Sequence, residues 1–265
     1  MKANKPTFLG HSRPLLTCMV QAENPTDAIN IVRNAAYDGC DAYGFQICRF
    51  VPRYRDKKTF HEIFRHMEDK PIYITNYRDG FNQGLSDEEC AEGLLFGLEC
   101  GATLCDVMGD LYAPGHPLQL TDEPAAVARQ RALIDRIHER GGEVILSSHV
   151  MKFLPAGQVV ELALKQQARG ADVVKIVCAA NSDEEQIENL RITTLLRDAL
   201  DVPFLFLSGG THYKLHRMIG PMLGCAMYLT VQQHDPLSTK SQPVLRSVRA
   251  VLDNFDYKPD RAFED

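Results

Sequence analysis

The sequence lacks the signals of several large classes of protein. Basic residues are not in excess, since 29 Lys and Arg stand against 35 Asp and Glu, so nothing indicates nucleic acid or an anionic membrane as a partner. The longest apolar runs have the length of a strand, and residues 1–6 contain no signal-peptide core. No low-complexity linker divides the chain. These absences predict one domain with no membrane association.

The cysteines also show what the chain does not have. Eight are present, but no two form a C-x-x-C pair. Several fall in stretches predicted as strands or helices, where a free cysteine behaves as a small hydrophobic residue. Because disulfide frameworks belong to oxidising compartments, scattered thiols of this kind predict a cytoplasmic protein.

Short apolar runs alternate with longer amphipathic stretches along the chain, and Ser86–Glu89 and Ser182–Glu185 predict capping boxes at two helix starts. Strict alternation indicates a parallel α/β sheet with helical crossovers. Eight units predict a single (β/α)8 TIM barrel, class I aldolase-like, over residues 1–265, with an open doubly wound sheet as the alternative. No strand is followed by a glycine-rich nucleotide motif, so we expect no cofactor. The predicted strands are 15–20, 42–47, 71–76, 102–108, 143–149, 172–178, 203–208 and 225–231.

Lys175 stands inside the apolar run Ala-Asp-Val-Val-Lys-Ile-Val-Cys-Ala, which reads as a buried strand. Loss of hydration lowers the pKa of an amine, and a neutral amine attacks carbonyl groups, so Lys175 is a candidate for Schiff-base chemistry. The alternatives are a lysine neutralised by a carboxylate and one that extends from the strand end to solvent.

His149 ends the preceding predicted strand. Neighbouring strands lie about 5 Å apart, so its imidazole and the Lys175 amine can act on one substrate. Schiff-base formation needs a proton donor and the later steps need a base, and a Lys–His pair supplies both. As metal ligands, His149 and Asp106 are unconvincing, because no ligand spacing recurs, and we expect no metal.

Other polar residues gather at the predicted strand ends. The seventh strand ends in Gly209-Gly210, which lets a ligand approach the backbone, and Arg217 in the next helix offers a planar fork for a carboxylate. The polar loop 232–242 can act as a lid. By the simpler interpretation, Arg217 is a solvated helix residue. Arg49 follows the second predicted strand, Arg78 and Asn82 follow the third, and Asp106 lies near the end of the fourth. By the simpler interpretation, Asp106 is a structural carboxylate.

Four motifs stand in a fixed order along the chain. They are Ser-Ser-His149, Gly-Ala-Asp-Val-Val-Lys175-Ile, Leu-His-Arg217-Met-Ile-Gly and Ser238-Thr-Lys-Ser-Gln242. In these positions the sequence resembles the type I 3-dehydroquinate dehydratase family over nearly the whole barrel.

The resemblance implies a chemistry and a set of roles. It implies that Lys175 forms an imine with a ring ketone, and that His149 removes the neighbouring proton and then helps a β-hydroxyl leave as water. It further implies that Arg217 binds a substrate carboxylate while Ser238 and Gln242 close over it. The resemblance thus implies a hydro-lyase of shikimate or quinate metabolism that acts on a small carboxylate. It also implies a homodimer.

The sequence departs from the family at the residues that would hold the substrate's ring hydroxyls and at the carboxylate that would support the histidine. The family's Glu-x-Arg on the second strand is replaced by Gln46 and a displaced Arg49, which should point away from Gln46 unless a bulge re-aims it. Arg78 and Asn82 keep the next spacing, but an amide replaces the carboxylate that supports the histidine. The stretch 109–124 is longer than expected. We still expect these four residues to contact the substrate, with weak activity on 3-dehydroquinate or a preference for a different ring.

Two other functions are compatible with the sequence. One is a different Schiff-base barrel enzyme, such as an aldolase that cleaves a C–C bond. The other is a binding protein that kept the barrel without its activity. The presence of both Lys175 and His149 favours catalysis over the second alternative.

Overall fold

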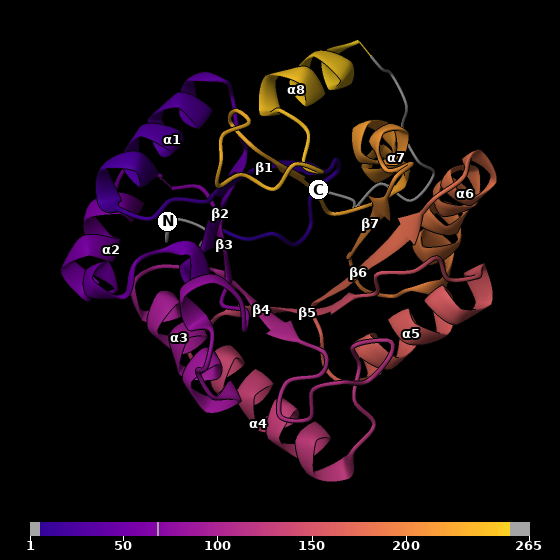
Figure 1. Ribbon diagram of the computed structural model, residues 1–265, viewed down its shortest axis with the longest axis horizontal. Helices are drawn as coiled ribbons and strands as arrows, with labels where there is room; N and C mark the ends of the chain where they lie inside the picture. Colours follow the sequence, from indigo (N-terminus) through magenta and orange to yellow (C-terminus); the bar gives the residue numbers. More distant parts are fainter. Residues whose placement is uncertain (1–5, 68, 255–265) are drawn as a thin grey trace.

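The computed structural model describes residues 6–67 and 69–254. Eight parallel strands are ordered β7-β6-β5-β4-β3-β2-β1-β8, and the helices form a ring outside them (Figure 1). The backbone N–H of Ala226 donates to Phe204 O at 2.8 Å, which links the segment before β8 to β7 and nearly closes the barrel. The strands are β1 Leu15–Val20, β2 Ala42–Gln46, β3 Ile72–Thr75, β4 Leu104–Met108, β5 Glu143–His149, β6 Val173–Ala180, β7 Phe204–Gly210 and β8 Met227–Thr230.

The helices follow the strands one by one. Ser86 and Glu89 form the predicted reciprocal capping box of α3. At α6, Ser182 caps the Glu185 amide, but the Glu185 carboxylate accepts from the backbone of Asn181 instead, so the second box is only half formed. The helices are α1 Pro25–Tyr37, α2 Lys57–Phe64, α3 Asp87–Glu99, α4 Pro124–Glu139, α5 Ala156–Ala168, α6 Asp183–Ala199, α7 Lys214–Ile219 and α8 Leu245–Asp253.

The structure confirms the predicted TIM barrel, and the open doubly wound sheet is wrong. Each predicted strand is present within two residues of its expected bounds. The difference that matters lies at β2, which ends at Gln46 because Ile47–Arg49 forms a 3-10 turn. None of the helices in the described ranges is long and apolar enough to cross a membrane.

Register between neighbouring strands aligns the functional residues. Ser147 on β5 pairs with Lys175 on β6, and His149 pairs with Val177. His149 therefore lies two residues, or about 6–7 Å, closer to the carboxyl ends of the strands than the lysine backbone does. Because side chains alternate between the two faces of a strand, Ser147, His149, Lys175 and Val177 all point into the barrel.

Candidate active site

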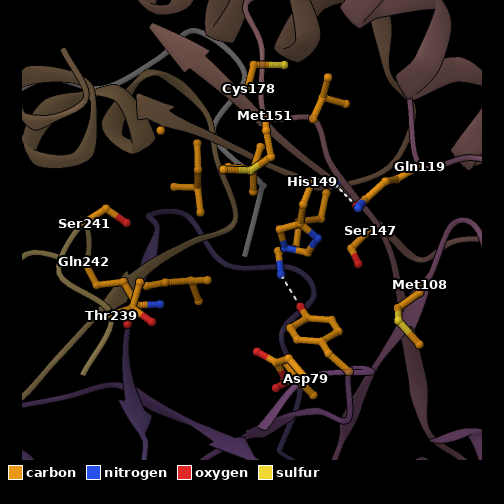
Figure 2. A pocket seen from close by; sticks show the side chains of 18 of the residues that line it. Asp79, Met108, Gln119, Ser147, His149, Met151, Cys178, Thr239, Ser241 and Gln242 are labelled. Carbon is orange, nitrogen blue, oxygen red and sulfur yellow. Dashed lines mark hydrogen bonds between the residues drawn. The ribbon is translucent and has the colours of Figure 1, made fainter. Parts of the chain in front are cut away.

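A cavity of about 620 Å³ opens at the carboxyl ends of the strands, and residues from all eight strands line it. This is the end of a TIM barrel at which active sites are built. Figure 2 shows His149 in the middle of the lining side chains, with Ser147 and Gln119 to one side and Gln242 to the other.

Lys175 lies at the inner end of this cavity and is 3% exposed. Its Nζ donates to Asp106 Oδ2 at 2.9 Å and to the hydroxyls of Tyr73 and Tyr77 at 2.8 Å each. Both phenols donate to the same Asp106 oxygen, and Ser147 donates to the other. The buried lysine is thus paired with a carboxylate, as one alternative from the sequence anticipated, and it also faces the cavity.

Burial sets the protonation of this group. It lowers the pKa of Lys175, and the Asp106 charge opposes that shift. Burial acts to raise the pKa of Asp106, but the Lys175 charge together with the hydrogen bonds from Ser147 and Tyr73 holds the pKa below its usual value. Burial, followed by the Asp106 charge, raises the pKa of Tyr73 and Tyr77, so both phenols remain protonated near neutral pH.

His149 lines the cavity above Lys175, and its ring packs edge-to-face on Tyr77 with centroids 5.3 Å apart. Burial and then the Lys175 charge lower the pKa of His149 to about 3. Among the described residues, neither ring nitrogen has a hydrogen-bond partner. The imidazole is therefore neutral near pH 7, with both ring nitrogens available to a ligand in the cavity.

The loop between β4 and α4 supports His149 through its backbone. Gln119 Oε1 accepts from the His149 amide at 2.8 Å, and Gln119 O accepts from the Ser148 hydroxyl at 2.9 Å. Gln119 adopts a positive φ of 46°, a conformation uncommon outside glycine. Gly109 allows this approach, because a Cβ there would meet Gln119 O at 2.4 Å. The long stretch 109–124 thus contributes Gln119 to the cavity, a role that the sequence did not reveal.

Arg217 is buried at the cavity wall, with 6% exposed. Its Nε donates to Ser208 O at 2.6 Å, and burial lowers its pKa to about 10. In the described part of the chain no carboxylate pairs with it. The interpretation of Arg217 as a solvated helix residue is wrong. Because buried charges are normally paired, this guanidinium is a candidate for binding an anion.

The loop after β8 covers one side of the cavity. Gln242 lines it, and Gln242 Oε1 is buried without a hydrogen-bond partner. Thr239 is fixed by Gln21, which accepts from its amide at 2.8 Å and donates to its hydroxyl at 2.7 Å. Ser238 does not line the cavity, which corrects the expectation of a direct contact, because its hydroxyl donates to Asp235 O within the loop.

At β2 the structure rearranges the expected polar residues. The 3-10 turn after Gln46 brings Arg49 back to the cavity, so a local irregularity re-aims it, although as a turn after the strand and not as a bulge within it. The Gln46 amide is occupied, since Oε1 accepts from Gln21 at 2.7 Å and Nε2 approaches Cys48 Sγ at 3.5 Å. Arg49 Nη2 instead donates at 3.1 Å to Asp79, a cavity carboxylate that the sequence interpretation missed.

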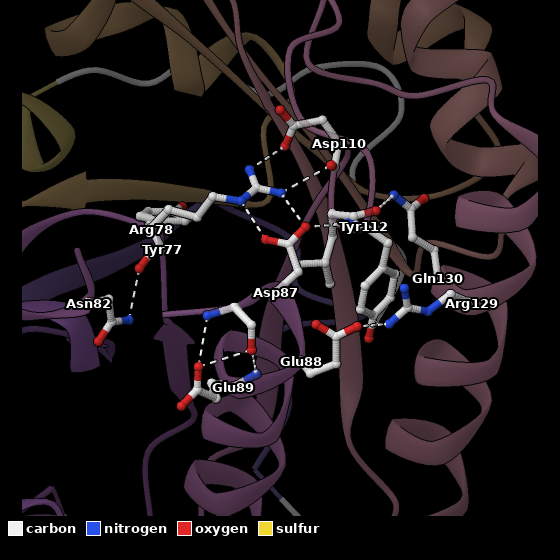
Figure 3. A network of polar contacts seen from close by, with 12 residues as sticks. Tyr77, Arg78, Asn82, Asp87, Glu88, Glu89, Asp110, Tyr112, Arg129 and Gln130 are labelled. Atoms are coloured by element: carbon white, nitrogen blue, oxygen red, sulfur yellow. Dashed lines mark hydrogen bonds and ion pairs between the residues drawn. The ribbon is translucent and has the colours of Figure 1, made fainter. Parts of the chain in front are cut away.

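Arg78 and Asn82 have structural partners (Figure 3). Arg78 lines the cavity but makes four hydrogen bonds, two to Asp87 and two to Asp110. Since a guanidinium has five N–H donors, one remains. Asn82 lies outside the cavity and bonds Arg55 and Asn76. The expectation that Asn82 contacts the substrate and orients the histidine is wrong, because a 3-10 turn over Gly80–Asn82 directs its amide into the protein.

In the parts of the chain that the structure describes, no group of three His, Cys, Asp or Glu residues is arranged to hold a metal ion. All eight cysteines are buried free thiols. Two of them, Cys48 and Cys178, have pKa values raised to about 12, mainly by burial, so neither is a nucleophile near neutral pH.

Buried histidines predict how stability depends on pH. His216, like His149, is fully buried with a pKa lowered to about 3 by burial and then by Arg217. Between pH ~6.5 and ~3 the unfolded chain binds protons at these positions that the folded chain does not, so the free energy of unfolding should fall as pH is lowered through this window. Urea unfolding at a series of pH values should show that the free energy of unfolding falls less steeply with decreasing pH in His216→Gln than in the wild type. The difference in slope should be up to about 1.4 kcal/mol per pH unit. An unchanged slope would contradict a neutral buried His216.

Comparison with known sequences identifies one family. The profile of type I 3-dehydroquinase matches residues 17–258. A 3-dehydroquinate dehydratase of Alkaliphilus oremlandii is 32% identical over 95 residues, which cover 35% of this chain and 37% of the relative. One from Klebsiella pneumoniae is 30% identical over 129 residues, covering 48% of this chain and 50% of the relative. The chain thus matches about half or less of the length of these relatives.

Solved structures agree in fold. The type I 3-dehydroquinate dehydratase of Clostridium difficile, solved with covalently modified comenic acid, superposes with a TM-score of 0.77 at 18% identity, over 92% of this chain and 93% of that one. The 3-dehydroquinate dehydratase of Enterococcus faecalis gives a TM-score of 0.74 at 17% identity, over 94% and 96%.

Proposed function

Because this chain belongs to the type I 3-dehydroquinase family, we propose that it dehydrates 3-dehydroquinate through an imine on Lys175. The observation that carries the proposal is the position of this lysine. Its amine lies at the inner end of the cavity, with a lowered pKa and the neutral imidazole of His149 above it. A buried amine next to a proton-transfer group is the arrangement that carbonyl condensation requires.

We assign the substrate carboxylate to Arg217. This guanidinium is buried without a carboxylate partner, and an anion would complete it with charge-assisted hydrogen bonds. Gln242 lies beside the same cavity with one buried amide oxygen unpaired, which can accept from a substrate hydroxyl. Ser238 acts indirectly, by shaping the loop that carries Gln242.

We assign the ring hydroxyls to Asp79 and Arg49. Asp79 Oδ1 and Arg49 Nε are buried atoms without partners, although the two side chains share one ion pair. Together they offer an acceptor and a donor side by side, which suits hydroxyl groups. The carboxylate absent at Gln46 is thus supplied from the turn after β3, so weak activity on 3-dehydroquinate is no longer expected.

The chemistry proceeds by β-elimination. Once the ketone is an iminium on Lys175, the carbon next to it becomes acidic, because the iminium accepts the electron pair. His149, neutral and above the lysine, removes that proton and returns it to the departing β-hydroxyl, which leaves as water. Hydrolysis of the conjugated iminium then releases the enone and restores the amine.

A direct assay tests this function. Purified protein mixed with 3-dehydroquinate should produce the absorbance of a conjugated enone, and mass spectrometry should show a product lighter by one water. Products of C–C cleavage would instead indicate an aldolase. Absence of any turnover, with Lys175 and His149 intact, would indicate a binding protein.

The assignment of Asp79 predicts a loss that depends on the substrate. Hydrogen bonds to a charged group contribute about 1.5–3 kcal/mol, so Asp79→Asn should lower kcat/KM on 3-dehydroquinate by up to about 10- to 150-fold. An analogue that lacks a ring hydroxyl should be affected much less. Gln46→Glu should give no gain, because the Gln46 amide already bonds Gln21. Equal losses on both substrates, or a clear gain from Gln46→Glu, would contradict this assignment.

We further propose a cytoplasmic homodimer. The eight buried free thiols suit a reducing compartment, and the family resemblance suggests the dimer. Sedimentation equilibrium should give twice the monomer mass, and a single-chain mass would contradict it.

A further inference from the structure

The hydrogen bonds around Lys175 account for every proton on its amine. An ammonium has three N–H donors, and here one goes to Asp106 and one each to Tyr73 and Tyr77. Both phenols in turn donate to Asp106 Oδ2. In its ammonium form Lys175 is therefore fully bonded, and it must lose protons to this cluster before it can attack a carbonyl.

Imine formation requires two of these protons to reach one oxygen. The ammonium carries three protons and the iminium one, and the ketone oxygen leaves as water with the two that differ. No external acid or base is needed if the groups that already hold these protons deliver them. His149 is not part of this cluster, because the hydrogen bonds of Nζ go to Tyr73, Tyr77 and Asp106.

We propose that Tyr77, backed by Asp106, is the catalytic proton relay for imine formation, a role that rests on the proposed function. Tyr77 follows the end of β3, is half-buried and packs on His149, whereas Tyr73 lies within β3 and is fully buried. Both phenols line the cavity with hydroxyls 2.8 Å from Nζ, but only the Tyr77 side chain is not fully buried. The oxygen of a carbinolamine is bonded to the carbon next to this nitrogen, so it forms within reach of the Tyr77 hydroxyl.

The steps balance within the cluster. Asp106 takes one proton from Nζ, and the neutral amine forms the C–N bond as the carbonyl π electrons move to oxygen. Tyr77 gives its proton to that oxygen and is reprotonated from the nitrogen. The proton on Asp106 then passes through Tyr77 to the carbinolamine hydroxyl, the C–O bond breaks, and water leaves as the nitrogen lone pair forms the iminium.

This assigns different steps to different residues. Tyr77 and Asp106 serve the C–N bond, while His149 serves the C–H and C–O bonds of the elimination. It also explains how the site works without a carboxylate on the imidazole, because His149 does not have to act as the acid for imine formation.

Rapid-quench borohydride trapping separates the two roles. With 3-dehydroquinate, Tyr77→Phe should form the trappable adduct at least ~100-fold more slowly than the wild type, the lower range for general acid–base catalysis. Tyr73→Phe is the matched control, because it loses the equivalent hydrogen bonds to Nζ and Asp106 from the more deeply buried phenol. It should slow trapping less than ~10-fold. His149→Ala should trap at close to the wild-type rate and then stall.

A second variant distinguishes loss of the proton relay from a folding defect. Tyr77→3-fluorotyrosine keeps the hydroxyl and the ring but lowers the phenol pKa, so the pH profile of trapping should move to lower pH. Wild-type trapping rates in Tyr77→Phe, or an unmoved profile, would overturn the relay while leaving the proposed function intact. A wild-type protein that turns over substrate without any adduct would overturn both.

Discussion

Lys175→Met should remove essentially all dehydration of 3-dehydroquinate. The lysine supplies the nitrogen that becomes the electron sink, and no other lysine lines the cavity within the described residues. Without an iminium the α-proton is far less acidic, so turnover should fall by roughly 10⁶-fold or more, toward the uncatalysed rate. Steady-state kinetics with the enone absorbance would measure this. Residual turnover within ~100-fold of wild type would contradict a covalent role.

The same variant should also lose stability, which provides a control. Removing Lys175 leaves Asp106 charged and buried, and breaking a buried ion pair costs about 3–5 kcal/mol. The double variant Lys175→Met/Asp106→Asn removes both charges and should recover much of that loss in urea unfolding, yet remain inactive. A stable but inactive double variant separates catalysis from folding.

His149→Ala should lower kcat by about 10²–10⁴-fold while imine formation continues. Neither ring nitrogen has a partner among the described residues, and the strand register places the imidazole above Lys175 in the same cavity. Single-turnover experiments should therefore show an accumulated adduct that eliminates slowly.

A half-buried histidine outside the cavity gives the matched control for this prediction. His212 follows β7, does not line the cavity and should tolerate alanine with unchanged kinetics. If His149→Ala retained near-normal turnover, the residue would be a rim side chain without a catalytic role.

The barrel could be predicted from the sequence because its signal is periodic. Each strand is a short apolar run, and alternation with amphipathic helices leaves few topologies. The period of two within strands also places His149 and Lys175 on the inner face. The same alternation contains Asp106 and Tyr73, so their presence inside the barrel was available from the pattern, although their bonds to Lys175 were not.

The polar rim could not be predicted in the same way, because turns have no period. A single 3-10 turn after Gln46 re-aims Arg49, and another directs Asn82 away from the cavity. Gly80 is the one local signal at this position. Its φ of 58° and a hypothetical Cβ only 2.5 Å from Cys48 O show that these turns pack together, which pairs Asp79 with Arg49.

Long-range pairings were equally hidden. Arg78 reads as a substrate contact by its spacing, but Asp87 and Asp110 saturate most of its guanidinium and so fix the long β4–α4 loop. That loop places Gln119 against the backbone of His149. The contacts to Asp110 and Gln119 leave no local trace in the sequence, because each joins residues about 30 positions apart.

Borohydride reduction during turnover, followed by peptide mass analysis, tests the central claim most directly. With 3-dehydroquinate present, the account predicts a single reduced adduct on the peptide that contains Lys175, with the mass of the substrate or product joined to the amine. In Lys175→Met, it predicts that no reduced adduct forms on the corresponding peptide. Sustained turnover without an adduct, or an adduct on a different lysine, would contradict the account.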